Sequence, residues 1–317
     1  MHIPVPPAGS SVECVWPLGA VLGEGPVWVS SRAELWFVDI KGCRIHCHGE
    51  GGVRRSFPTP ELAAFVFPCA TGGFLCGLKS GLFHFDPDHG GFTPLQRVDA
   101  RHPSNRLNDG CIDAVGRLWF GTMDNDEQAA SGSVYRYDGC RLETMDRGYV
   151  ITNGPAFSPD GRTLYVADTV NQQVFAFDVD AAGTLSRKRL FVRLEETDTY
   201  PDGPAVDCEG NVWVGLFGGW GVACYSPQGR LLRKVGLPVS RCTKVAFGGA
   251  DLQTLYITTA SVGLGDEEQA RQPLAGGLFR LRVDTPGQPQ NPFGAKNVTG
   301  KPRVRNLIHH SRPPDAS

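Results

Sequence analysis

A short apolar strand containing an aromatic residue, preceded by a Gly or Asp turn, recurs along the chain. The copies are residues 34–39 (ELWFVD), 72–77 (GGFLCG), 116–121 (GRLWFG), 162–168 (RTLYVAD), 210–215 (GNVWVG) and 253–258 (QTLYIT). Their central residues, Trp36, Leu75, Trp119, Tyr165, Trp213 and Tyr256, lie 39 to 48 positions apart. A regular spacing in this range is typical of repeat folds that are built from one small unit.

Each unit contains further strands in the same order. An apolar strand precedes the aromatic one, as in GPVWVS from residue 25, and another follows it, as in GLFHFD from residue 81. A fourth, more polar strand, such as RRSFPT from residue 54, suits an outer edge. Four antiparallel strands repeated six times predict an all-β fold, a six-bladed β-propeller. A pair of β-sandwiches or a β-helix is the alternative.

The two ends of the chain complete this prediction. Residues 12–16 (VECVW) can supply the outer strand of the last blade and so close the ring. We therefore predict a single propeller domain over residues 1–284. Residues 285–317 are rich in Pro, Gly, Asn and Arg and poor in aromatic side chains, which predicts a flexible C-terminal tail.

Composition supports strands and turns and excludes several partners. The chain has 40 Gly and 24 Pro among 317 residues, a content that disfavours helices. A net charge of -2 provides no positive field for nucleic acid. The longest apolar runs, such as residues 61–70, are shorter than the roughly 18 residues that span a bilayer. The first residues lack the pattern of a secretory signal, and the ten Cys include no CxxC pair, so we expect a cytoplasmic monomer or weak oligomer.

Polar residues open the first strand of most units. In a propeller this strand lines the central channel, so its opening side chain points to one mouth of the axis. The openers are Glu24, Asn108 with Asp109, Asn153, Asp202, and Thr243 with Lys244. Taken singly, they could be ordinary turn residues. Taken together, they bring hard oxygen donors from four units to one point, which predicts a bound divalent cation: Ca²⁺, Mg²⁺ or Mn²⁺, with Fe²⁺ and Zn²⁺ tolerated.

The same strings resemble a known family. LGEGPVW, NRLNDGCID followed by GRLWFGTM, ITNGPAFSPDGRTLYVADT and YPDGPAVD occur in the order found in the SMP-30/gluconolactonase/regucalcin-like sugar lactonases. The resemblance covers about residues 14–284. Within the family, the strings VDIKGCRIH, MDRGYVITNGP and QPLAGGLF are most similar to the bacterial xylonolactonase and L-arabinonolactonase branch.

The resemblance implies a set of site residues. Glu24, Asn153 and Asp202 would bind one divalent metal, and Arg106, Asn108 and Asp126 would contact the substrate. Many members have Pro-Thr-Asn where this chain has Cys-Thr-Lys at residues 242–244. That difference either places a cation at the rim of the pocket or leaves the lysine facing solvent.

The resulting hypothesis is hydrolysis of a small-molecule aldonolactone to the open aldonate. The substrate would be a pentonolactone such as xylonolactone or L-arabinonolactone, or gluconolactone. The metal would act as a Lewis acid on the lactone carbonyl, with Asp202 as general base. Two alternatives remain: a regucalcin-like calcium-binding propeller or other non-enzymatic binding module, and an aryl-ester or organophosphate hydrolase, which would need an apolar rim.

Overall fold

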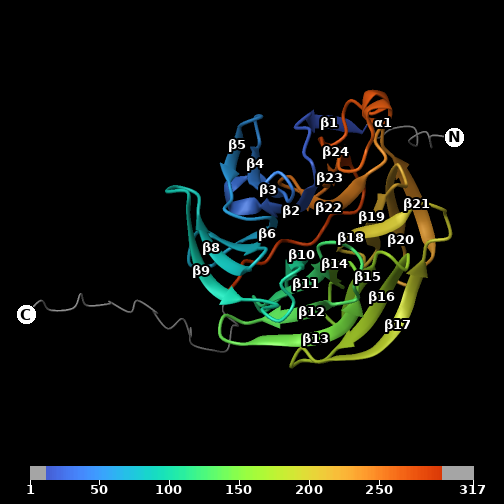
Figure 1. Ribbon diagram of the computed structural model, residues 1–317. Coiled ribbons are helices and arrows are strands. Elements are labelled where there is room, and N and C mark those ends of the chain that lie inside the picture. Colours follow the sequence, from blue (N-terminus) through green and yellow to red (C-terminus); the bar gives the residue numbers. More distant parts are fainter. Residues whose placement is uncertain (1–11, 295–317) are drawn as a thin grey trace, which may run out of the picture.

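The computed structural model describes residues 12–294, and its sheets stand around a central axis (Figure 1). Four of them are antiparallel with four strands each. The first contains β2 (Gly23–Val29), β3 (Glu34–Asp39), β4 (Arg44–Gly49) and β5 (Arg54–Pro58). The second contains β6 (Ala63–Pro68), β7 (Phe74–Leu78), β8 (Gly81–Asp86) and β9 (Gly91–Arg97). The third contains β10 (Asn105–Ile112), β11 (Leu118–Asp124), β12 (Gly132–Tyr137) and β13 (Leu142–Tyr149). The fourth contains β14 (Thr152–Phe157), β15 (Thr163–Asp168), β16 (Gln173–Val179) and β17 (Leu185–Arg193).

The remaining strands form one sheet of eight. Its order is β1-β24-β23-β22-β18-β19-β20-β21. The strands are β1 (Glu13–Trp16), β18 (Tyr200–Val206), β19 (Val212–Phe217), β20 (Gly221–Tyr225), β21 (Leu231–Gly236), β22 (Cys242–Gly248), β23 (Thr254–Thr259) and β24 (Leu278–Arg282). The all-β propeller class is therefore confirmed, but six separate four-stranded sheets are not observed. The physical reason is that β18 and β22 pair in parallel at Gly203 and Lys244, which joins two sets of four strands.

The first strands of all units surround the axis. Each contacts the next in turn, from β2 through β6, β10, β14, β18 and β22 back to β2. At the seam, β1 pairs antiparallel with β24, with Cys14 opposite Phe279. Arg280 Nε also donates to Glu13 Oε2 at 2.9 Å, so a side-chain contact reinforces the join.

The chain beyond residue 284 continues to pack against the sheets. The Gly287 N–H donates to the Leu252 carbonyl, and Gln288 Nε2 donates to the carbonyls of Phe157 and Val206 at 3.2 and 3.1 Å. Phe293 stacks on Tyr137 with ring centroids 5.8 Å apart. Packing thus extends to residue 294, ten residues past the predicted boundary, and Figure 1 shows this segment in red crossing the middle of the ring. Residues 295–317 of the predicted tail lie outside the described residues.

The core lies between neighbouring sheets and contains the repeated aromatic residues. Trp36, Trp119 and Trp213 are fully buried. Two of these indoles donate to an Asp in the preceding turn: Trp119 Nε1 to Asp113 at 2.8 Å and Trp213 Nε1 to Asp207 at 3.1 Å. The turn aspartates therefore connect each hairpin to its buried tryptophan, satisfying donors that burial would otherwise leave unpaired.

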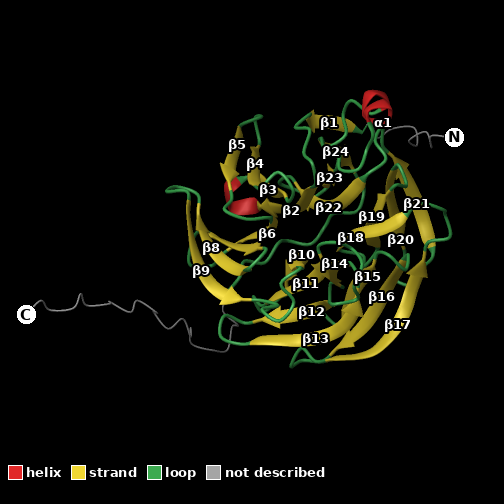
Figure 2. Cartoon of the chain, viewed as in Figure 1, coloured by secondary structure: helices red, strands yellow, loops and turns green. Residues whose placement is uncertain are grey.

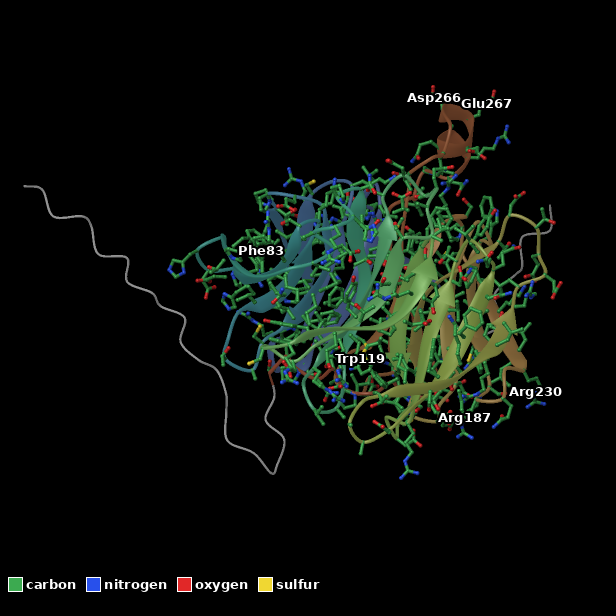
Figure 3. The ribbon with its side chains drawn as sticks, turned by 60° about the horizontal axis from the view of Figure 1, so that its bottom comes forward. Phe83, Trp119, Arg187, Arg230, Asp266 and Glu267 are labelled. Atoms are coloured by element: carbon green, nitrogen blue, oxygen red, sulfur yellow. The ribbon has the colours of Figure 1, made fainter. Side chains whose placement is uncertain are left out.

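Helices contribute little to the part of the chain that the structure describes. Figure 2 shows strands and loops almost throughout, with a 3-10 turn at Ser30–Arg32 and α1 at Asp266–Arg271. In Figure 3, Asp266 and Glu267 project with α1 from the ring, and Arg187 and Arg230 lie at its edge. Over residues 12–294, no helix combines the length and apolarity needed to cross a membrane.

A buried histidine on β4 makes the stability of the protein depend on pH. His46 packs edge-on against Trp16 of β1, with ring centroids 5.5 Å apart, and its Nδ1 contacts Ser56 Oγ at 2.8 Å. Its Nε2 is buried without a hydrogen-bond partner among the described residues. Burial lowers the pKa of His46 from 6.5 to about 4; the charge of Arg44 lowers it further, and that of Asp39 opposes the shift.

Acidification is therefore expected to destabilise the fold through His46. The unfolded state takes up this proton near pH 6.5 and the folded state only near pH 4, so the stabilisation is present above pH 6.5 and is lost as the pH falls. The loss is about 3 kcal/mol. Denaturant unfolding of the wild type and His46→Gln between pH 7 and 4 should show the steeper decline in the wild type. His102→Gln, at an exposed site where the histidine takes part only in backbone hydrogen bonds among the described residues, is the control. Equal declines in wild type and His46→Gln would contradict the assignment.

Candidate active site

Irregularities in the pairing of neighbouring strands direct the predicted polar side chains toward the axis. Every first strand shifts register against its neighbour near its start: between Glu24 and Val27 on β2, Ala63 and Phe65 on β6, Leu107 and Gly110 on β10, Asn153 and Ala156 on β14, Pro201 and Pro204 on β18, and Cys242 and Val245 on β22. Such bulges redirect side chains that a regular strand would send to alternate faces. The openers therefore face inward together, and β6 offers only Ala64 at this position.

Glu24 and Asp202 form the acidic part of the site. Both are buried, with Glu24 Oε2 accepting from the Gly25 N–H at 2.9 Å and Asp202 Oδ1 accepting from the Gly203 N–H at 3.0 Å. Burial, and then the negative charge of Asp109, raise the pKa of Glu24 to about 8. The pKa of Asp202 is raised well above its ordinary value by burial, by the charges of Glu24 and Asp109, and by hydrogen bonding with Glu24. Two desolvated carboxylates this close are stable in the ionised form only beside a positive charge.

Asn153 is linked through Thr169 to β18, the strand that carries Asp202. Its Nδ2 donates to Thr169 Oγ1 at 2.9 Å, and Thr169 Oγ1 donates in turn to the Pro201 carbonyl at 2.9 Å. Its Oδ1 accepts from Asn108 Nδ2 at 2.8 Å. The amide is therefore fixed with its oxygen toward the axis. Thr169 was not singled out from the sequence, although it closes the ITNGPAFSPDGRTLYVADT string.

Arg106 is a buried cation that adjoins the acidic pair. Its Nη1 donates to Asn108 Oδ1 at 2.6 Å and to the Leu107 carbonyl at 3.0 Å. Burial lowers the pKa of Arg106 to about 10, against the raising effects of the carboxylates of Glu24, Glu127 and Asp202. Asn108 thus links the arginine to Asn153.

The loop after β11 places its acidic residues differently from the sequence expectation. Asp126 is exposed, and its backbone hydrogen bonds, with Asp124 and Gln128, stay inside its own turn. Its neighbour Glu127 is the loop carboxylate whose charge acts on Arg106. No pattern in the sequence distinguishes Asp126 from Glu127, because the turn that follows Asp124 sets which side chain approaches the arginine.

Lys244 lies neither at the rim nor in solvent, which corrects both expectations for this residue. It is 6% exposed, and its Nζ donates to Asp109 Oδ1 and to the Gly110 carbonyl, the latter at 3.1 Å. Asp109 is 1% exposed, and its Oδ2 accepts from the Gly154 N–H at 2.9 Å. Because β22 and β10 stand three places apart in the ring of first strands, this buried ion pair spans the channel.

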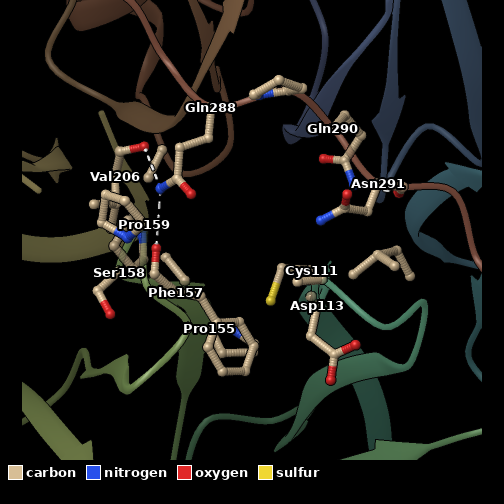
Figure 4. A pocket seen from close by; sticks show the side chains of 18 of the residues that line it. Cys111, Asp113, Pro155, Phe157, Ser158, Pro159, Val206, Gln288, Gln290 and Asn291 are labelled. Atoms are coloured by element: carbon tan, nitrogen blue, oxygen red, sulfur yellow. Dashed lines mark hydrogen bonds between the residues drawn. The ribbon is translucent and has the colours of Figure 1, made fainter. Parts of the chain in front are cut away.

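A second compartment lies beyond that ion pair. A cavity of ≈ 370 Å³ is lined by later residues of the first strands and by residues 288–291. Figure 4 shows Cys111, Pro155 and Phe157 on its strand side and Gln288, Gln290 and Asn291 facing them. Lys244 and Gly110 line it, but Glu24, Asn153 and Asp202 do not. The channel is thus divided, with the polar cluster at one end only.

The proposed ligand residues fit one divalent cation if the side-chain amide of Asn153 is counted together with the two carboxylates. Over residues 12–294, no three His, Cys, Asp or Glu side chains are grouped as metal ligands by themselves. Glu24 and Asp202 supply two carboxylates, and Asn153 supplies an oriented amide oxygen beside them. Oxygen ligands of this kind suit Ca²⁺, Mg²⁺ and Mn²⁺.

The chain resembles several characterised proteins over most of its length. It is 35% identical over 285 residues to the 6-deoxy-6-sulfogluconolactonase of Pseudomonas putida, covering 87% of this chain and 96% of that one. It is 35% identical over 264 residues to the L-arabinolactonase of Azospirillum brasilense, covering 81% and 87%. Among solved structures, a calcium-binding protein, regucalcin, from Agrobacterium tumefaciens str. C58 superposes with a TM-score of 0.85 at 26% identity, covering 88% and 96%.

The family assignment follows from the region that carries the site. The sequence profile described as "SMP-30/Gluconolactonase/LRE-like region" matches residues 22–261, which run from the start of β2 past the end of β23. This range contains every first strand and each of the polar openers. The chain therefore belongs to the SMP-30/gluconolactonase/LRE-like family.

Proposed function

We propose that this protein is a metal-dependent sugar lactonase, a hydrolase of carboxylic ester bonds that opens an aldonolactone to its aldonate. The observation that carries the proposal is the convergence of Glu24 and Asp202, both desolvated and both with raised pKa, beside the fixed amide of Asn153. Its substrate is a pentonolactone such as xylonolactone or L-arabinonolactone, or gluconolactone. The eight-stranded sheet acts as two blades, which gives six around the axis.

The residues divide the chemistry between them. Glu24, Asn153 and Asp202 would hold one divalent cation: Ca²⁺, Zn²⁺, Fe²⁺, Mn²⁺ or Mg²⁺. When bound, the cation supplies a Lewis acid for the lactone carbonyl and neutralises the charge that develops on its oxygen. Asp202 accepts the proton of the attacking water, which requires its carboxylate to be ionised.

Arg106 contributes more to the proposed substrate binding than Asn108 does. Both N–H groups of the Asn108 amide are occupied, by the Thr152 carbonyl at 2.7 Å and by Asn153 Oδ1, so this side chain keeps only an oxygen lone pair for a ligand. Among the described residues, Arg106 donates hydrogen bonds only through Nη1, so it retains further N–H groups for sugar hydroxyls. Asp126 could reach the substrate only from the exposed loop.

A calcium-binding role without catalysis is the second candidate. It is favoured by the likeness to a solved regucalcin whose description is a calcium-binding protein. The buried Arg106 argues for turnover, because a site that only bound a cation would gain nothing from a second positive charge beside its ligands.

Hydrolysis should be tested with protein stripped of metal and reloaded with one divalent ion at a time. D-xylono-, L-arabinono- and D-gluconolactone would be offered, and acid release followed at constant pH. We expect turnover of at least one lactone, its loss on stripping and its recovery on reloading. The exposed Glu267→Gln variant serves as a control that should match the wild type. Calcium binding without hydrolysis of any lactone would favour the second candidate.

We also propose a small-molecule partner, with no nucleic acid or membrane, because the chain is nearly neutral. A cytoplasmic location and a monomeric or weakly oligomeric state belong to the same proposal.

A further inference from the structure

Five buried charges surround the proposed metal position. Glu24, Asp109 and Asp202 are negative, whereas Arg106 and Lys244 are positive, and each residue is at most 6% exposed. The charge of Asp109 acts on both Glu24 and Asp202, so this third carboxylate lies close to the proposed ligands. With all five ionised the net charge is minus one. Lys244 therefore decides whether the cluster carries one or two uncompensated negative charges.

The path of Lys244 is built into the fold. Its side chain leaves β22 beside Gly203 of β18, the two residues that pair in parallel. A Cβ on Gly203 would lie 2.6 Å from Lys244 Cγ, closer than real contacts allow, so glycine at this position makes room for the lysine. A substituent there would displace the lysine from a site directly next to Asp202.

Asp109 is anchored by three hydrogen-bond donors. They are Lys244 Nζ and the backbone N–H groups of Gly110 at 2.7 Å and Gly154 at 2.9 Å. Gly154 follows Asn153 directly, so the same carboxylate also fixes the backbone of the proposed amide ligand. The Lys244–Asp109 ion pair therefore affects both the net charge of the five residues and the position of the backbone next to Asn153.

We propose that Lys244 is a positioning residue that keeps Asp109 out of the metal-ligand set and thereby weakens and tunes the affinity for the divalent cation. The inference rests on the proposed metal site. Its physical basis is charge: removing the ammonium leaves Asp109 as an added attraction for a cation, and removing the Asp109 carboxylate leaves the ammonium as a repulsion. A site that is too tight would hold its cation at the expense of the lactone oxygen.

The test is a double-mutant cycle read out by metal binding. Metal-stripped wild type, Lys244→Met, Asp109→Asn and the double variant would be titrated with Mn²⁺ at pH 8, and free Mn²⁺ followed by electron paramagnetic resonance. We expect Lys244→Met to bind about tenfold tighter than wild type, Asp109→Asn about tenfold weaker, and the double variant within about threefold of wild type. Lys234→Met, at a half-buried lysine that pairs with Glu196, is the matched control and should bind as the wild type does.

The opposite signs separate this role from a structural one. If Lys244 only supported the fold, Lys244→Met and Asp109→Asn would both weaken binding, and that result overturns the inference. The double variant leaves no unpaired buried charge and should fold even if a single variant does not; an affinity more than tenfold from wild type would also overturn it. If the wild type binds no Mn²⁺, both the proposed metal site and this inference are overturned. If the wild type binds Mn²⁺ but the affinities of the variants do not follow the expected order, only this inference is overturned.

Discussion

Asp202→Asn is expected to lower kcat for lactone hydrolysis by at least about 10³-fold, since the change removes both a metal ligand and the general base. The same change should stabilise the metal-free protein. In the wild type, Asp202 and Glu24 are both buried, and burial together with the charge of Glu24 raises the cost of ionising Asp202. An amide in place of one carboxylate removes that repulsion while keeping the size of the side chain.

The pH dependence of stability checks the second half of this expectation. The pKa of Glu24 is raised from 4.5 to about 8 in the folded state, so the stabilisation from its protonated form is complete below pH 4.5 and is lost as the pH rises through 8. Metal-free wild type should therefore lose stability from pH 5 to 8. The raised pKa of Asp202 itself adds to this loss, and Asp202→Asn removes that contribution, so the variant should lose less.

Thermal unfolding of the stripped proteins at both pH values measures this difference, with a gain of about 2–4 °C expected for Asp202→Asn at pH 8. Full activity in Asp202→Asn would refute the assignment of Asp202. Inactivity together with a less stable metal-free protein would indicate damage to the fold instead.

Arg106→Met is expected to lower kcat/KM by about 10- to 100-fold, mainly through a higher KM. The estimate corresponds to one or two charge-assisted hydrogen bonds to sugar hydroxyls. Because binding energy of this kind is present in both the ground and transition states, kcat should change little. Steady-state kinetics on the preferred lactone give the two constants separately.

Arg106→Lys distinguishes charge from shape. Lysine keeps the positive charge beside Glu24 but loses the planar donor group that reaches Asn108 Oδ1 at 2.6 Å. We expect it to recover only part of the lost kcat/KM. Arg187→Met, at an exposed arginine, should have no effect. An Arg106→Met variant with unchanged KM would remove this arginine from the substrate site.

The repeat predicted the strands and the polar openers because both depend on local pattern. The aromatic strand expected at residues 34–39 is β3, and Glu24, Asn153 and Asp202 are all buried on first strands. Each of those residues precedes a Gly. The turn pattern that predicts the start of a first strand therefore also predicts which residues lie at the mouth of the channel.

Contacts between residues that are far apart along the chain left no comparable pattern in the sequence. The direction of Lys244 could not be inferred because the bulge between Cys242 and Val245 breaks the alternation of faces from which side-chain direction is normally deduced. The packing of Gln288 depends on backbone carbonyls of distant strands, which any sequence presents. The joined sheet likewise depends on a single parallel pair.

The pairing of β1 with β24 has a consequence for how the chain is made. Glu13 and Arg280, which face each other across this seam, are 267 positions apart in sequence. During synthesis β1 leaves the ribosome long before its partner exists, while the intervening units, whose strands pair with near neighbours, can already form. Contacts between such distant residues form slowly. Closure of the ring must therefore wait until β24 has been synthesised, and until then β1 lacks its partner strand.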